Sequence, residues 1–125
     1  MIGSTRQIVV YAYREPVDMR KAFDALTALV VRGLRRDVMS GEVFLFVNRT
    51  RKRAKVLYWD GTGLCLFAKR LAKGQFAAPW ARKGEGPVML TTTELALLLE
   101  GNELIARMPL SPPPFKPADR VLPWA

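Results

Sequence analysis

The sequence predicts an α+β domain, with one long helix on a face of a mainly antiparallel sheet of four to five strands. Short runs rich in valine, isoleucine and aromatic residues alternate with turn-forming glycine, proline and aspartate, a pattern typical of strands. One stretch, 18–31, carries apolar residues at helical spacing. A chain of 125 residues, half of them hydrophobic, has the size and balance of one domain.

The N-terminal part is expected to form a strand followed by the long helix. Residues 7–13 form the strand, which ends before Pro16 because proline has no N–H to donate to a strand ladder. Asp18 suits a helix N-cap, and Gly33 is a natural helix stop. The apolar stripe of this helix contains Met19, Ala22, Phe23, Leu26, Leu29 and Val30.

Three successive strands are expected to form a meander in the middle of the chain. Residues 43–47 are apolar at every position, which fits a central strand covered on both faces. Residues 55–59 make a matching partner strand. Asp60 and Gly61 give a strong turn signal, after which residues 64–69 return as the second strand of a hairpin.

The C-terminal half adds a short strand and a short helix. A further edge strand is expected at 76–78, and residues 81–87 form a loop rich in glycine and charge. Thr91 and Glu94 have the spacing of a capping box, so a second helix starts there and ends at Gly101. We expect this helix to pack at an end of the sheet.

The last residues have the composition of a tail. Six of the nineteen residues at 107–125 are proline, which favours extended chain over a packed core. We therefore expect a single α+β domain at 1–106 and a disordered proline-rich tail at 107–125.

Positive charge is concentrated in one stretch of the chain. The protein has 20 Lys and Arg against 11 Asp and Glu, a net charge of +9. Residues 49–83 hold half of these cations and a single acid, so the remainder of the chain is neutral. Such an excess normally faces phosphates or an anionic membrane. We therefore expect an acidic partner. No apolar run approaches the roughly 18 residues that a membrane span needs, so we also expect a cytoplasmic protein.

The sharpest local feature is a run of five cations at 49–55, between two predicted strands. A loop so charged cannot be buried, and we expect it to project as a basic finger that contacts phosphates. The alternative is a solvated hairpin tip that only keeps the protein soluble. More cations follow at 69–73, as a basic patch. The residues predicted to bind nucleic acid are Arg49, Arg51, Lys52, Arg53, Lys55, Lys69, Arg70 and Lys73.

Aromatic residues are interleaved with these charges. If they were exposed, they could stack on unpaired bases. The alternative is that they form the core of the sheet, as aromatic residues on strands of small domains usually do. The aromatic residues concerned are Tyr58, Trp59, Phe67, Phe76 and Trp80.

The residues for catalysis and metal binding are largely missing. The chain has no histidine and one cysteine, Cys65, which excludes a histidine-coordinated metal site, a Ser-His-Asp triad and an internal disulfide. A nuclease would need two or three carboxylates that converge on metal ions. Under that hypothesis, replacing Asp18 or Asp60 would abolish metal-dependent cleavage. Both acids have local roles, as a helix cap and a turn former. We therefore expect no enzymatic activity, no cofactor and no metal.

Five blocks of sequence, in order and with fitting gaps, resemble the TnpB-type accessory proteins of bacterial insertion sequences of the IS sixty-six kind. These are the small products of the second open reading frame, not the guide-RNA nucleases that share the name. The resemblance extends from about Val10 to Leu104. The blocks are DMRKAFD at 18–24, SGEVFLF at 40–46, KVLYWDGTGL at 55–64, KRLAKGQF at 69–76 and ELALLLEG at 94–101.

This resemblance implies an accessory protein of transposition that acts beside a larger transposase, which carries the cutting and joining carboxylates. It assigns no catalytic role to any residue. The expected function is non-catalytic DNA binding, on transposon ends, through the basic finger and the basic patch. The alternative is a protein-interaction module that docks on the transposase without direct DNA contact.

Overall fold

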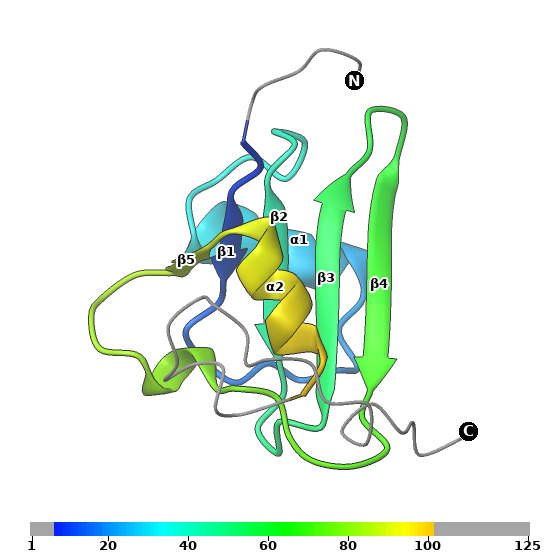
Figure 1. The fold of residues 1–125 in the computed structure, drawn as a ribbon. Coiled ribbons are helices and arrows are strands. Elements are labelled where there is room, and N and C mark those ends of the chain that lie inside the picture. The colour runs from blue at the N-terminus through cyan, green and yellow to red at the C-terminus, as the bar shows by residue number, and fades with distance from the viewer. Residues whose placement is uncertain (1–6, 102–125) are drawn as a thin grey trace.

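The computed structural model describes residues 7–101, which form a five-stranded mixed sheet with helical segments on both faces (Figure 1). The sheet order is β4-β3-β2-β1-β5. The predicted tail at 107–125, and the predicted domain beyond residue 101, lie outside the described residues. The strands are β1 (Val10–Ala12), β2 (Val43–Val47), β3 (Arg53–Trp59), β4 (Leu64–Arg70) and β5 (Val88–Leu90).

The sheet is mixed because β1 and β2 run parallel, with Val10 opposite Val43. Between them, helix α1 (Phe23–Ala28) and the π-helical turn η1 (Leu29–Gly33) carry the chain back across one face, as a parallel connection requires. The other three strand pairs are antiparallel. The predicted α+β class is confirmed, and the mainly antiparallel sheet is corrected to a mixed one.

The first helix is shorter than predicted. It begins at Phe23, and its N-cap residue Ala22 makes no side-chain capping bond. Asp18 is not the cap, because its carboxylate accepts hydrogen bonds from the backbone N–H of Arg20 at 2.8 Å and from the Arg20 guanidinium. The N–H of Lys21 bonds to the Asp18 carbonyl at 3.1 Å. Asp18 thus closes a local turn ahead of the helix, an arrangement that aspartate side chains commonly stabilise.

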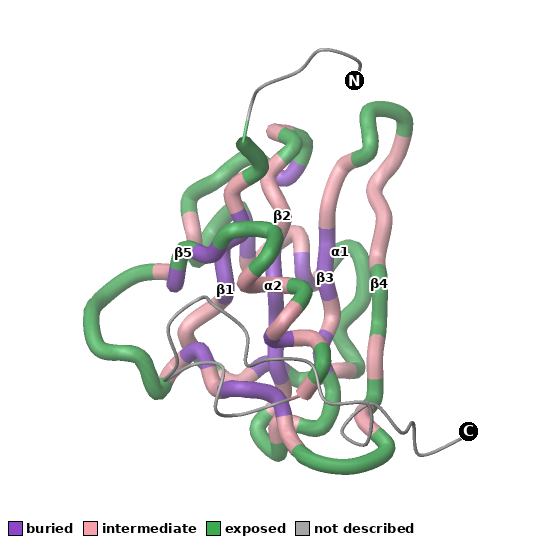
Figure 2. Tube along the Cα trace, in the orientation of Figure 1, coloured by how far each residue is buried: buried purple, intermediate pink, exposed green. Residues whose placement is uncertain are grey.

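Each face of the sheet carries its own apolar core, and buried residues are concentrated in the central strands (Figure 2). Phe44 and Phe46 of β2 pack with Leu26 of α1 on one face, whereas Leu45 and Val47 pack on the opposite face. These four side chains of β2 are fully buried. This confirms the prediction of a central strand covered on both faces, because successive side chains of a strand point to opposite sides.

The second helix, α2 (Thr92–Leu99), begins at the predicted capping box, in which Thr91 and Glu94 cap each other. Gly101 follows it with a φ of +80°, a left-handed conformation that glycine adopts without strain. α2 lies over the face of the sheet opposite α1 (Figure 1), and its Leu98 joins the core there. The prediction that this helix packs at an end of the sheet is therefore wrong.

The fifth strand lies elsewhere than predicted. Residues 76–78 form no strand, although Phe76 is fully buried in the core beneath α2. The strand is β5, which pairs antiparallel with β1 and directs Val88 and Leu90 into that core, while Met89 is exposed. The apolar residue Phe76 is therefore buried as expected of a core residue, but it does not pair with a strand.

Candidate nucleic-acid interface

The predicted basic finger is a tight turn between β2 and β3. The Asn48 side chain closes it, since its Oδ1 accepts from the backbone N–H groups of Lys52 at 3.1 Å and Arg53 at 3.0 Å. The Asn48 N–H also donates to the Arg53 carbonyl at 3.0 Å. Only residues 49–52 lie in the turn, because Arg53 and Lys55 belong to β3. A long projecting loop over 49–55 is therefore corrected to a short, internally bonded turn.

The segment that follows β4 is bonded to this turn. The N–H of Leu71 donates to the Lys52 carbonyl at 2.9 Å, and the N–H of Phe76 donates to the Arg51 carbonyl at 2.6 Å. The side chain of Gln75 accepts from the Arg51 guanidinium at 3.0 Å and donates to the Thr50 carbonyl at 3.0 Å. The two cationic stretches predicted from the sequence thus meet at one end of the sheet, in the lower part of Figure 1. We call residues 49–55 and 69–73 together the basic end.

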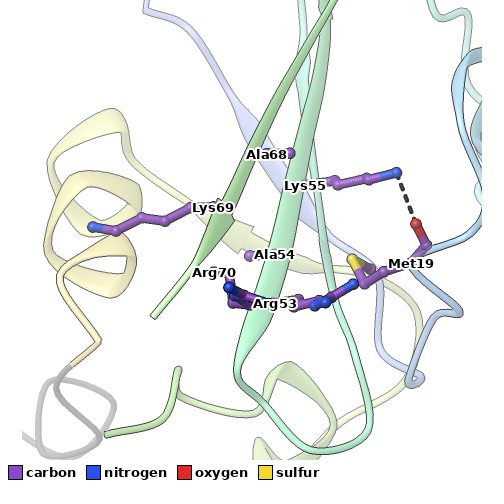
Figure 3. A pocket seen from close by; sticks show the side chains of 7 residues that line it. All are labelled: Met19, Arg53, Ala54, Lys55, Ala68, Lys69 and Arg70. Atoms are coloured by element: carbon purple, nitrogen blue, oxygen red, sulfur yellow. Dashed lines mark hydrogen bonds between the residues drawn. The ribbon is translucent and has the colours of Figure 1, made fainter. Parts of the chain in front are cut away.

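The strand register divides the cations of the basic end between two faces. Arg53 stands opposite Arg70, and Ala54 stands opposite Lys69. Arg53, Lys55 and Arg70 therefore lie on the face that α1 covers, whereas Lys69 lies on the α2 face. Figure 3 shows the Lys55 and Lys69 side chains on opposite sides of the hairpin. The eight predicted residues consequently share one end of the molecule but not one surface.

A pocket of about 380 Å³ lies on the α1 face of the basic end. Three of its lining residues are cationic and on the same strand face, Arg53, Lys55 and Arg70, and Ala68 opposite Lys55 leaves room between them. None of the carboxylates in residues 7–101 lines it. The lining consists of Met19, Arg53, Ala54, Lys55, Ala68, Lys69 and Arg70 (Figure 3).

Lys55 connects this pocket to the segment ahead of α1. Its Nζ donates to the backbone carbonyls of Met19 at 2.8 Å and Lys21 at 2.7 Å. These bonds use two of the three N–H groups of the ammonium and leave its positive charge without a carboxylate partner in residues 7–101. Lys55 therefore holds one wall of the pocket in place while it contributes charge.

Lys69 has a different partner. Its Nζ donates to the carbonyl of Leu99 at 2.7 Å, in the last turn of α2. The last carbonyl groups of a helix lack partners within the helix, and the helix dipole favours a cation there. This contact holds the Lys69 side chain against α2.

The other predicted residues differ in exposure. Arg49, Lys52 and Lys73 are exposed, as are Arg53 and Arg70. Arg51 is partly buried against Gln75. The described carboxylates that pair with arginine do so elsewhere, in the pairs Arg20–Asp18, Arg36–Glu42 and Arg82–Glu94.

Met19 lines the pocket, a position that the sequence does not indicate. The sequence predicts residues 18–21 as the start of a helix, whereas in the structure they precede it. The Arg20 side chain is 92% exposed and bonds to Asp18. This bonding holds the pKa of Asp18 down at about 2. No sequence signal could reveal the contact, because it joins positions 34 and 36 residues apart.

The carboxylates considered for nuclease chemistry lie in local structures. Asp60 accepts from the backbone N–H groups of Thr62 at 2.8 Å and Gly63 at 2.9 Å, and so builds the hairpin turn as predicted. In the described part of the chain, no three His, Cys, Asp or Glu side chains gather as a metal site would require. In the same part, none of the helices combines the length and the apolar character needed to cross a bilayer.

The aromatic residues that are interleaved with the charges in the sequence belong mostly to the core. Phe76 is fully buried, and Tyr58 and Trp80 pack against the core on the α2 face. Phe67 is 46% exposed on edge strand β4. The interpretation of these residues as core fits them better than a continuous stacking surface does.

Comparison with known proteins identifies the family. A family model described as IS66 Orf2 like protein matches residues 8–108. The chain belongs to the IS66 Orf2-like family. Two uncharacterized proteins of Sinorhizobium fredii, y4jC and y4hO, are 34% and 33% identical to it over 101 residues. The matches cover 81% of this chain and 85% and 86% of these relatives. No solved structure matches the IS66 Orf2-like chain.

The family is one of accessory proteins associated with insertion-sequence transposition. This agrees with the resemblance seen in the five sequence blocks. The matched region includes the whole sheet, both helices and every residue of the basic end.

Proposed function

We propose that this IS66 Orf2-like protein is a non-catalytic accessory protein of transposition that binds the DNA backbone through its basic end. The observation that carries the proposal is the meeting of two separate cationic stretches around one pocket that no carboxylate of the described chain lines. Arg53 and Arg70 stand directly opposite each other, where like charges destabilise a sheet. Cations that served only solubility would not require this unfavourable placement. A polyanionic ligand offsets that repulsion.

The arrangement fits backbone contact rather than base reading. The turn at 49–52 is short and internally bonded, so it offers a fixed set of charges along a surface and no long element to enter a groove. Five exposed cations are available for phosphates, and five neutralised phosphates give a slope of about −4.5 for the logarithm of affinity against the logarithm of salt concentration. The cations are Arg49, Lys52, Arg53, Arg70 and Lys73.

A non-catalytic role is supported by the partners of Asp18 and Asp60, the acids considered for nuclease chemistry. Asp18 is bound by Arg20 and Asp60 by its own turn, so both carboxylates are engaged in local structure. We propose that the protein positions DNA for the transposase, which performs the chemistry.

The test is DNA binding by the purified full-length protein, measured by fluorescence anisotropy across a salt series. Arg49→Gln combined with Lys52→Gln removes two charges from the turn. We expect this variant to lower affinity for terminal inverted-repeat DNA and for random duplex alike, and to flatten the salt slope by about two. The matched control is Arg32→Gln with Arg35→Gln, which removes two exposed charges from η1 and from the loop ahead of β2, outside the basic end.

Equal losses in the two variants would show that only bulk charge matters and would refute the basic end as the binding surface. A wild-type protein that binds no DNA would refute the proposal as a whole. In that case, capture of the transposase in high salt after nuclease treatment would favour the alternative, docking on the transposase without DNA contact.

A further inference from the structure

The face of the sheet beside α1 holds an arrangement more specific than a basic surface. Arg53 and Arg70 are direct cross-strand partners, and their side chains stand on the same face. Side chains in this relation lie within contact distance, and two like charges so placed are unfavourable. Neither arginine has an ion pair with a carboxylate among the described residues.

A third charge is fixed beside this pair. Lys55 follows Arg53 by two positions on the same strand face, and its Nζ is held by the carbonyls of Met19 and Lys21. The residue opposite Lys55 is Ala68, whose short side chain leaves the pocket open at this point. Two planar guanidinium groups and one immobilised ammonium therefore surround an open space of about 380 Å³.

The chemistry of these groups selects an oxyanion. A guanidinium presents a rigid fork of N–H donors that matches two oxygens of a phosphate, and an ammonium adds a point charge. We infer that Arg53, Arg70 and Lys55 form a discrete phosphate-binding pocket, which receives one phosphate of the DNA backbone. This inference rests on the proposed function, because it assigns one phosphate of the bound DNA to this pocket and leaves the others to the exposed turn.

The inference has a consequence that general electrostatic attraction lacks. Arg53 and Arg70 repel each other in the free protein, and this repulsion lowers the stability of the fold. Removing one of them removes the repulsion and also removes a group that binds the ligand. Arg70→Gln should therefore keep or raise the melting temperature in dilute chloride buffer, while it lowers DNA affinity by about tenfold or more.

The pocket can also be probed without DNA. Inorganic phosphate should raise the melting temperature of the wild-type protein more than sodium chloride does at the same ionic strength. Arg70→Gln and Arg53→Gln should each abolish this difference. Arg70→Lys, which keeps the charge but not the fork, should retain only part of it. Arg32→Gln removes an exposed charge from η1 and should behave like the wild type.

The two proposals fail in different ways. Equal stabilisation of wild type and Arg70→Gln by phosphate, or unchanged DNA affinity of Arg70→Gln, would overturn the pocket and leave DNA binding by the turn in place. A wild-type protein stabilised by phosphate that binds no DNA would instead support the pocket as an oxyanion site and overturn the proposed function.

Discussion

Cationic side chains that look alike in the sequence have different partners in the fold. Lys69 and Arg70 are neighbours on β4, yet Lys69 donates to the Leu99 carbonyl of α2 while Arg70 faces Arg53 across the strand pair. The first contact satisfies a helix end, and the second leaves two charges unpaired in the described chain. We therefore expect Lys69 to stabilise the fold and Arg70 to bind DNA.

Replacing Lys69 tests this division at the level of one residue. Lys69→Met should lower the free energy of unfolding by about 1 kcal/mol, because the last turn of α2 loses a charged donor. Affinity for DNA should stay within about twofold of wild type. Urea denaturation and fluorescence anisotropy measure the two quantities.

Lys73→Met is the matched control, since Lys73 is exposed in the segment after β4. It should show the reverse pattern, with unchanged stability and weaker binding. Normal stability combined with weak DNA binding in Lys69→Met would contradict the structural role of Lys69.

Part of the site was predictable from residue patterns. The alternation of side chains along a strand places Lys69 and Arg70 on opposite faces whatever the fold. It does not tell which of them meets a helix, because Leu99 lies 30 residues away. The two bonds from Lys55 to the 18–21 segment escape the sequence for the same reason.

At the scale of elements, the β3–β4 hairpin depends on one carboxylate. Asp60 accepts hydrogen bonds from the backbone N–H groups of Thr62 and Gly63 and from the Thr62 hydroxyl. These bonds favour the ionised form and lower the pKa of Asp60 from 3.8 to about 2. The stabilisation is complete above the unfolded pKa of 3.8 and is lost as the pH falls toward the folded pKa of about 2.

The wild-type protein should therefore lose stability between pH 4 and pH 2, in part through this turn. Asp60→Asn keeps the side-chain oxygen but cannot ionise, so its urea midpoint should depend less on pH in this window. Asp18, whose pKa is also about 2, contributes to the same fall, and Asp18→Asn combined with Asp60→Asn should flatten it further. An unchanged pH dependence in both variants would contradict the assignment.

The elements divide into those set by neighbours in sequence and those set by distant contacts. The Asp60 turn and the Thr91 capping box follow from three or four adjacent residues, and both were predicted. The late start of α1 depends on Asp18 bonding with Arg20, a local alternative to capping that uses the same side chain. The parallel pairing of β1 with β2 and the position of β5 depend on long-range packing, which periodicity does not encode.

For the whole molecule, a net charge of +9 on 125 residues means that the fold is under self-repulsion. Added sodium chloride screens exposed charges, so the melting temperature should rise between about 10 mM and about 150 mM salt. Arg49→Gln combined with Lys52→Gln should start from a higher melting temperature and rise less. A melting temperature that falls with salt in the wild type would show that attractive pairs outweigh this repulsion.

Because β1 and β2 run parallel, the start of β1 and the basic end lie at opposite ends of the sheet. Val10 lies opposite Val43, where β2 begins, whereas the turn at 49–52 follows the other end of β2. An attachment to a sensor made at Val10 would therefore hold the described chain by the end of the sheet remote from Arg53 and Arg70. The cations would face the flowing solution, which makes this the suitable geometry for kinetic measurements with nucleic acid.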